Sequence, residues 1–165
     1  MAALAPGRKA PDFSLSTLEG NHFSLKERLA YGPVVLAFFK VSCPTCQYAF
    51  PFLQRLFQAY KGQSVALVGV SQNERAETAA FAKEYGVTFP LVLDDTRKFP
   101  VSNAYDLTNV PTLFWIAPDG EIELVSVGWN KADFEKVNQR MAEIGKSPLV
   151  TPFGPGEEVR DFRAG

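Results

Sequence analysis

Two apolar runs without polar alternation stand out in the first half of the chain. Residues 34–39 (VVLAFF) and 65–70 (VALVGV) are each typical of a strand that is buried on both faces of a sheet. Residues 44–60, which lie between them, have the composition of a helix. A strand, a helix and a second strand in this order predict a βαβ unit with parallel neighbouring strands.

The rest of the chain continues with helix and strand patterns and closes with a hairpin. We expect a short N-terminal hairpin through 11–15 and 22–25, then a helix over 74–85 closed by Gly86 and a strand over 89–93. A helix over 97–105, capped by Asp94, Asp95 and Thr96, and a strand over 112–116 with its antiparallel partner over 121–128 follow. The last expected element is a helix over 131–144, whose inward-facing residues are Ala132, Phe134, Val137, Met141 and Ile144. The pattern predicts an α/β fold with a central mixed sheet of about five strands, flanked by helices on both faces.

The last twenty residues have a different composition. Three prolines and two glycines fall between positions 148 and 156, which is typical of an extended segment that lies on a domain or stays mobile. We therefore expect a single domain over residues 1–165, with a core of about 10–145 and an extended C-terminal tail over 146–165.

Composition and charge narrow the class of protein. With 46% hydrophobic and 21% charged residues the chain matches an ordinary soluble domain, and a formal charge of −1 argues against a nucleic-acid partner. No apolar run reaches the roughly 20 residues that a membrane span needs. The N-terminus lacks the charged start and long apolar centre of a signal peptide, so we expect a cytoplasmic protein, with a chain that begins after a removed targeting segment as the alternative.

The two cysteines, Cys43 and Cys46, follow the strand over 34–39 directly, in the sequence Cys-Pro-Thr-Cys. Pro44 suits the first position of a helix, since its missing N–H would have no helical partner there. Cys43 is then the N-cap residue, where free backbone N–H groups and the helix macrodipole lower the pKa of a thiol. Lys40 is a candidate for lowering this pKa further. A thiol of pKa ~8.5 is only about 3% thiolate at pH 7, whereas a thiol of pKa near 7 is about half thiolate.

Three interpretations compete for this pair. A structural disulfide would close a ring of about four residues and contribute ~2 kcal/mol in the loop-entropy model, against ~4.7 kcal/mol for a 100-residue loop. A structural zinc site needs four ligands, and the chain has two cysteines and one histidine. A redox pair needs a helix N-terminus, a preceding buried strand and a second thiol in reach, all of which are present. The redox interpretation is favoured, with no metal and no organic cofactor beyond the Cys43–Cys46 pair.

Further short motifs accompany the cysteine pair. They are Ala10-Pro11-Asp12-Phe13-Ser14-Leu15, Val70-Ser71, Leu93-Asp94-Asp95, Asn109-Val110-Pro111-Thr112, Pro118-Asp119-Gly120 and Val127-Gly128. With them the sequence resembles the thioredoxin-fold superfamily, and within it the thiol-disulfide oxidoreductases of the TlpA/ResA type, which border on the AhpC/TSA-like peroxiredoxins. The match covers nearly all of the chain to about residue 144. It implies a thioredoxin fold with an N-terminal hairpin and an inserted helix and strand over 74–93.

The resemblance also implies roles for residues outside the cysteine pair. Pro111 stands where the superfamily has a cis-proline, whose loop faces the dithiol. The backbone of Val110 would bind a substrate chain, and Thr112 would support the loop. Pro44 and Thr45, which lie between the cysteines, complete the expected substrate-binding residues.

The sequence departs from the superfamily at two positions near the dithiol. Ala37 replaces a buried acid that is often taken as the proton acceptor for the second cysteine, and Ser42 replaces a tryptophan. Glu74, Glu77 and Glu84 are candidates for the lost acid. The proton acceptor and the substrate preference therefore stay open.

The expected function is thiol-disulfide exchange, in which Cys43 attacks a substrate disulfide and Cys46 resolves the mixed disulfide. Expected partners are protein disulfides or dithiols or small thiols, together with an upstream reductant, and we expect a monomer. One alternative is a thiol peroxidase acting at Cys43, which is disfavoured because Lys40 and Cys46 replace a threonine and a glutamate of the peroxiredoxin motif. Another is a non-catalytic interaction module on the same fold.

Overall fold

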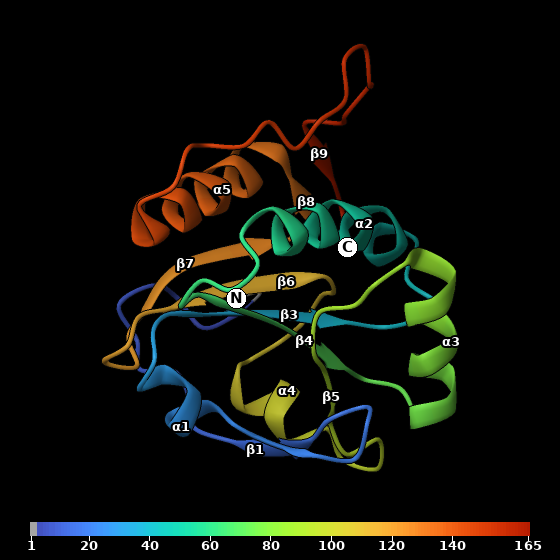
Figure 1. Ribbon diagram of the computed structural model, residues 1–165. Coiled ribbons are helices and arrows are strands. Elements are labelled where there is room, and N and C mark those ends of the chain that lie inside the picture. The colour runs from blue at the N-terminus through green and yellow to red at the C-terminus, as the bar shows by residue number, and fades with distance from the viewer. Residues whose placement is uncertain (1–2) are drawn as a thin grey trace.

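The computed structural model describes residues 3–165, and a five-stranded sheet runs through its centre (Figure 1). In spatial order the strands are β5 (Leu91–Leu93), β4 (Ala66–Ser71), β3 (Val34–Phe39), β6 (Thr112–Ile116) and β7 (Ile122–Val127). β4 is parallel to both of its neighbours, whereas β6 is antiparallel to β3 and to β7. The predicted mixed sheet, with its βαβ unit and closing hairpin, is confirmed.

Helices cover both faces of this sheet, as predicted. One face carries α2 (Pro44–Ala59), α3 (Arg75–Tyr85) and α5 (Lys131–Gly145), and the other carries α1 (Leu25–Leu29), α4 (Pro100–Ala104) and the hairpin of β1 (Ser14–Ser16) and β2 (His22–Ser24). In Figure 1, α2 and α5 lie above the sheet, and α1, α4 and β1 lie below it. Every long helix therefore stands on the same side of the sheet as α2.

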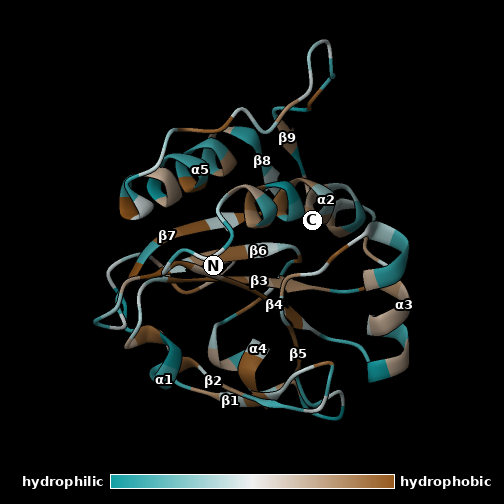
Figure 2. Cartoon of the chain, viewed as in Figure 1, coloured by the Kyte–Doolittle hydropathy of each residue, from teal (hydrophilic) through white to brown (hydrophobic). Residues whose placement is uncertain are grey.

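The central strand β3 serves both cores. All six of its residues are buried, which confirms the interpretation of the apolar run. Val35, Ala37 and Phe39 face the core under α2 and α5, and the alternate residues face the core above α1 and α4. Figure 2 shows the result as hydrophobic strands between amphipathic helices. The strand's C-terminal end leads directly to the cysteines.

The expected helix over 97–105 is wrong at its start, because α4 begins only at Pro100. Phe99 has a φ of 49°, in the left-handed region that no helix residue adopts. The carboxylate of Asp94 still caps α4, because it accepts a hydrogen bond from the backbone N–H of Ser102 at 2.9 Å. The capping residue was identified correctly, but it acts from six residues before the helix.

The inward face of α5 also differs from the expectation at its ends. Ala132 and Ile144 are exposed, whereas Asn138 is buried in their place. Asn138 accepts a hydrogen bond from the hydroxyl of Tyr60 and donates one to the backbone oxygen of Val150. A buried amide is tolerated at this position because both of its polar atoms have partners.

After α5 the chain runs back along the α2 side of the sheet. Its last strand, β9 (Phe162–Arg163), pairs antiparallel with β8 (Trp129–Asn130), the short strand before α5. In Figure 1 the C-terminus lies beside α2. Within residues 3–165, no helix has the length and the apolar character needed to cross a membrane.

Candidate active site

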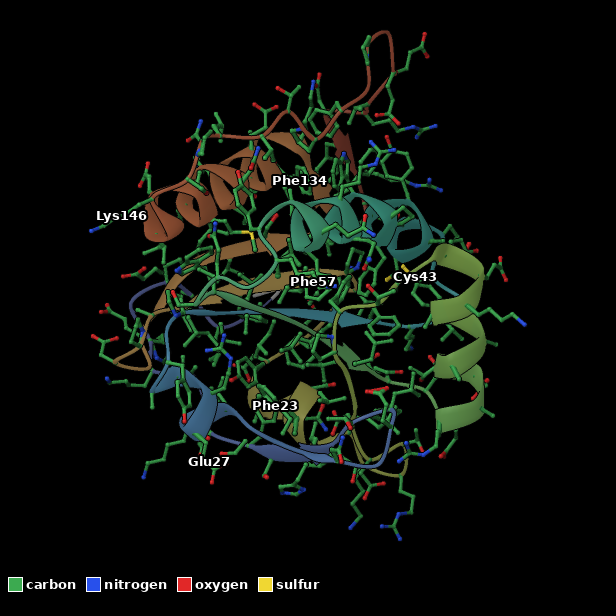
Figure 3. All side chains as sticks on the ribbon, in the orientation of Figure 1. Phe23, Glu27, Cys43, Phe57, Phe134 and Lys146 are labelled. Carbon is green, nitrogen blue, oxygen red and sulfur yellow. The ribbon has the colours of Figure 1, made fainter. Side chains whose placement is uncertain are left out.

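The two cysteines occupy the first turn of α2, as the sequence predicts. Cys43 is the N-cap residue, with Pro44 in the first turn behind it. The Sγ of Cys43 accepts a hydrogen bond from the backbone N–H of Cys46 at 3.1 Å. In Figure 3, Cys43 lies where α2 begins, on the opposite side of the sheet from Phe23 and Glu27. The helix N-terminus is therefore aimed at the first sulfur.

The surroundings of Cys43 favour its thiolate. Its pKa is lowered to about 6, first by the hydrogen bond from the Cys46 thiol, and further by the backbone N–H groups of Cys46 and Thr45 and the positive charge of Arg163; partial burial opposes these effects. A thiol with this pKa is about nine-tenths thiolate at pH 7. The side chain is part-exposed, so a reactant can reach it.

Cys46 has the opposite character. It is fully buried, and burial, followed by the neighbouring Cys43, raises its pKa well above the usual range of a thiol. Ala37 belongs to the same apolar cluster, in the place of the superfamily's buried acid. The pKa of Cys46 is shifted by its burial, by Cys43 and by backbone N–H groups. No carboxylate is among these causes, so Glu74, Glu77 and Glu84 gain no support as the proton acceptor of Cys46.

The Val110–Pro111 peptide bond is cis and its loop faces the dithiol, which matches the expectation. The backbone oxygen of Val110 lies 3.4 Å from the Sγ of Cys43. The buried hydroxyl of Thr112 donates a 2.8 Å hydrogen bond to the backbone oxygen of Asn109, across the loop. Thr112 thus ties the two ends of the loop together.

A cavity of about 230 Å³ lies beside this loop. Its wall includes Lys40, Gln72, Asn103, Asn109 and Val110. Lys40 is exposed there, and the cation that lowers the pKa of Cys43 is Arg163 from the C-terminal tail. The cation that lowers the pKa of Cys43 is therefore Arg163, 120 positions away in sequence, and not Lys40 as expected.

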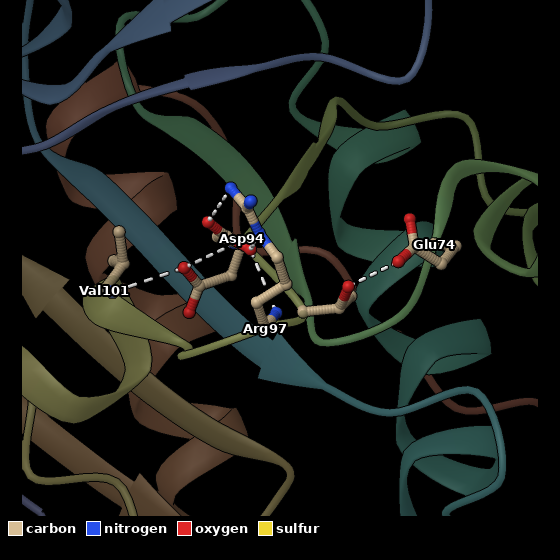
Figure 4. A network of polar contacts seen from close by, with 6 residues as sticks. Glu74, Asp94, Arg97 and Val101 are labelled. Atoms are coloured by element: carbon tan, nitrogen blue, oxygen red, sulfur yellow. Dashed lines mark hydrogen bonds and ion pairs between the residues drawn. The ribbon is translucent and has the colours of Figure 1, made fainter.

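The buried carboxylate of Asp94 holds two of the residues at the start of α4, and Figure 4 shows its contact with Val101. Asp94 is 3% exposed and accepts hydrogen bonds from the backbone N–H of Val101 at 3.2 Å and from the hydroxyl of Ser102 at 2.7 Å. Gln72 donates to the same hydroxyl at 3.0 Å. In the same view, Thr96 donates a hydrogen bond to Glu74, which joins the segment after β5 to the start of α3. This network fixes α4, from which the chain continues to the cis-proline loop.

The C-terminal tail reaches the dithiol, which the sequence analysis missed. The hydroxyl of Thr45 donates a 2.6 Å hydrogen bond to the backbone oxygen of Ala164. The guanidinium of Arg163 lies 5.6 Å from the ring centre of Tyr48, within the range of a cation–π contact. A Cβ added to Gly165 would collide with the backbone oxygen of Val110. A two-residue strand carries too little pattern for sequence analysis to find.

The single histidine and the two tryptophans have structural roles. His22 is exposed and bonds to the hydroxyl of Ser14 across the N-terminal hairpin. Trp115 and Trp129 are buried, with 2% and 3% of their surface exposed. Within residues 3–165, no group of three or more His, Cys, Asp and Glu side chains is placed to hold a metal ion.

Comparisons with known proteins agree with this geometry. The AhpC/TSA family matches residues 6–125. The thiol-disulfide oxidoreductase ResA of Geobacillus kaustophilus is 35% identical over 136 residues, which cover 81% of this chain and 76% of the relative. ResA of Bacillus subtilis is 35% identical over 127 residues, which cover 76% and 69%.

Solved structures show the same fold. A proposed protein disulfide isomerase from Bacteroides thetaiotaomicron superposes with a TM-score of 0.79 at 27% identity, covering 89% of this chain and 96% of its own. The thioredoxin fold expected from the sequence is confirmed. The chain belongs to the AhpC/TSA family, and within it to the thiol-disulfide oxidoreductases of the ResA type.

Proposed function

We propose that the chain exchanges thiols and disulfides with protein or small-thiol partners through a mixed disulfide on Cys43. The observation that carries this proposal is the contrast within one helical turn. Cys43 is part-exposed with a pKa lowered to about 6, whereas Cys46 is buried with a raised pKa. One sulfur is therefore ready to attack and the other is held in reserve as a thiol.

In the reductive direction the reaction has two steps. The Cys43 thiolate attacks one sulfur of the substrate disulfide, so that a new S–S bond forms, the substrate S–S bond breaks, and the leaving thiolate takes up a proton. The Cys46 thiol then loses its proton and attacks the Sγ of Cys43, which releases the second substrate thiol. The substrate gains two electrons and two protons, and the enzyme is left with a Cys43–Cys46 disulfide for an upstream dithiol to reduce.

The cis-proline loop supports the first step. The backbone oxygen of Val110 lies beside the attacking sulfur, and Thr112 braces the loop. Pro44 is exposed, and the hydroxyl of Thr45, between the two cysteines, donates its hydrogen bond to the backbone oxygen of Ala164. We propose that a substrate chain lies against these residues, with its disulfide in line with Cys43.

Single substitutions of the two cysteines test the mechanism. We expect Cys43→Ser to abolish reduction of insulin and of a small disulfide, because the remaining thiol is buried. We expect Cys46→Ser to keep the attack but to accumulate a mixed disulfide on Cys43, detectable by intact mass. If Cys43→Ser still reduces either disulfide at the wild-type rate, the proposal fails.

The alternatives predict different outcomes. A peroxidase would form a stoichiometric sulfenic acid on Cys43 of Cys46→Ser at micromolar peroxide. A non-catalytic module would have a Cys43 pKa near 8.5, which the lowered value argues against. The single domain, the monomeric state and the cytoplasmic location stay predictions from the sequence.

A further inference from the structure

Residues 160–165, here called the strap, cross the dithiol end of α2. Arg163 pairs with Trp129 in the β8–β9 ladder, and the backbone oxygen of Ala164 accepts the hydroxyl hydrogen bond of Thr45. Gly165 lies so close to Val110 that a side chain at this position would collide with the backbone oxygen of Val110. An extended segment of the chain itself therefore lies on the residues that we assign to substrate binding.

The sequence of the strap fits this close approach. Gly128 lies under it, and a Cβ there would come within 2.6 Å of the backbone oxygen of Arg163. Ala164 and Gly165 are the two smallest residue types, and they occupy the positions next to Thr45 and Val110. Small residues on both sides allow two backbones to lie against each other, as in the addition of a strand to an exposed edge.

The strap is held by contacts that can be exchanged. It contributes only a two-residue strand, and its one large apolar side chain, Phe162, is 58% exposed. Two hydrogen bonds anchor its start. The backbone N–H of Arg160 donates to the hydroxyl of Tyr48 at 3.0 Å, and the indole N–H of Trp129 donates to the backbone oxygen of Arg160 at 2.7 Å. Little apolar surface is lost from burial if the segment beyond Arg160 leaves.

We propose that the strap is an internal competitor, which occupies the peptide-binding site and must be displaced by a protein substrate. The inference rests on the proposed function, because it assumes that substrate chains lie against Thr45 and Val110. Since Cys43 stays part-exposed under the strap, a small disulfide reaches its sulfur without displacing anything. The strap thus selects against protein disulfides whose flanking chain binds weakly.

The strap also indicates what chemistry a displacing partner has. The guanidinium of Arg163 lies over the ring of Tyr48, so a partner segment with a cation at the matching position regains that contact. The position next to Val110 leaves no room for a side chain. The partner that fits is an extended, flexible segment with a basic residue two positions before a glycine.

Shortening the chain after Arg160 tests the proposal. The quantity to measure is kcat/KM for insulin and for bis(2-hydroxyethyl) disulfide at pH 8. At this pH the Cys43 thiol is almost fully ionised with or without Arg163. If the strap covers the site nine-tenths of the time, the shortened chain gains on the order of tenfold for insulin, mainly through KM, and less than about twofold for the small disulfide. Phe162→Ser is the matched control, because it keeps the strap backbone and changes an exposed side chain, and we expect no change.

A point substitution covers the case in which the shortened chain folds poorly. We expect Gly165→Val to displace the strap by its collision with Val110 and to raise the insulin rate in the same way. The peptide EVRDFRAG, residues 158–165, should inhibit insulin reduction by the shortened chain competitively, and a scrambled peptide should not.

Different results overturn the role of the strap and the proposed function. An unchanged ratio of insulin to small-disulfide rates in both strap variants overturns the inference and leaves the proposed function standing. Full activity of Cys43→Ser toward both disulfides overturns the proposed function itself.

Discussion

The two ends of the chain are attached to the domain in opposite ways. The N-terminal segment is held by apolar side chains that are buried under the α1 and α4 face of the sheet: Ala3, Leu4, Phe13, Leu25 and Leu29. The C-terminal tail, residues 146–165, crosses the α2 face with Leu149 and Phe162 both 58% exposed. Val150, Phe153 and Val159 of the tail pack partly buried against the core, whereas its last residues, from Arg160 on, are held by hydrogen bonds through Trp129, Tyr48 and Thr45.

This difference separates stability from access to the site. Buried apolar surface contributes to the free energy of unfolding of the whole domain, so a segment held in this way moves only when the core opens. Exposed backbone hydrogen bonds can be exchanged for water or for a partner at little net cost. The end of the chain that lies on the dithiol is the end that can be released.

The largest expected effect is on stability, at the N-terminal end. Leu25 is 1% exposed, so Leu25→Ala should lower the free energy of unfolding by ~2–5 kcal/mol, through lost burial and a cavity. Leu149→Ala, at the exposed end, should change it by less than ~0.5 kcal/mol. Urea unfolding of both variants measures the difference. Equal losses would show that the tail contributes to the core as the N-terminal segment does.

The joint between α5 and the tail should give the next largest effect. The hydroxyl of Tyr60 donates to Asn138 at 2.5 Å and accepts from the backbone N–H of Val150 at 3.2 Å. Tyr60→Phe leaves these buried partners unsatisfied, and should lower the free energy of unfolding by ~1–3 kcal/mol. It should also speed amide hydrogen exchange at Val150. Tyr31→Phe, at a 76% exposed position, is the matched control. Comparable exchange at Val150 in both variants would show that the Tyr60 hydroxyl does not hold the tail to α5.

These two expectations also show what the sequence could and could not predict. The run VVLAFF predicts β3 without error, because burial on both faces leaves a pattern that local chemistry alone explains. The N-cap position of Cys43 follows from Pro44 in the same way. Both depend on neighbours in sequence.

What the sequence analysis missed depends on partners that are distant in sequence. The cation near Cys43 is Arg163, and the polar cap of α4 acts across a left-handed Phe99 that no local signal marks. The strap pairs through its backbone, which carries no side-chain pattern. Lys40 is near Cys43 in sequence, but in the fold it lines the cavity beside the cis-proline loop.

The pH dependence of Cys43 sharpens the comparison at the site itself. Alkylation of Cys43 by iodoacetamide should rise through a midpoint at about pH 6, which mass spectrometry of the reduced wild type can follow, because buried Cys46 keeps its proton. Arg163→Ala should move the midpoint upward by a fraction of a unit, since Arg163 is one of several causes of the lowered pKa. Arg160→Ala is the matched control. An identical shift in both variants would mean that the charge of the tail acts only as a diffuse field.

The same pKa sets the sign of a stability effect. The pKa of Cys43 is lower in the folded state than its ordinary value of 9.0, so its thiolate stabilises the reduced fold fully above pH 9. This contribution falls as the pH falls toward about 6 and is lost below it. Reduced wild type should therefore lose stability relative to Cys43→Ser between pH 9 and pH 6, as measured by urea unfolding. No divergence of the two curves would contradict the lowered pKa.

The smallest expected effect is at the exposed ion pair between Glu157 and Arg55, which joins the tail to α2 at 2.7 Å. The hydrogen bonds from Arg55, and then from the N–H of Gly154, lower the pKa of Glu157 to about 2. Because the pKa is lowered, the ionised Glu157 stabilises the fold above pH 4.5, the ordinary pKa of this carboxyl, and ceases to do so as the pH falls toward 2.

Because the pair is solvated and screened by salt, Glu157→Gln should raise the insulin rate by less than about twofold, and less still at high salt. Glu158→Gln, one residue away, should leave the rate unchanged; if the two variants behave alike, the start of the strap is not held by this pair, and its hold lies entirely in the backbone contacts at Trp129 and Thr45.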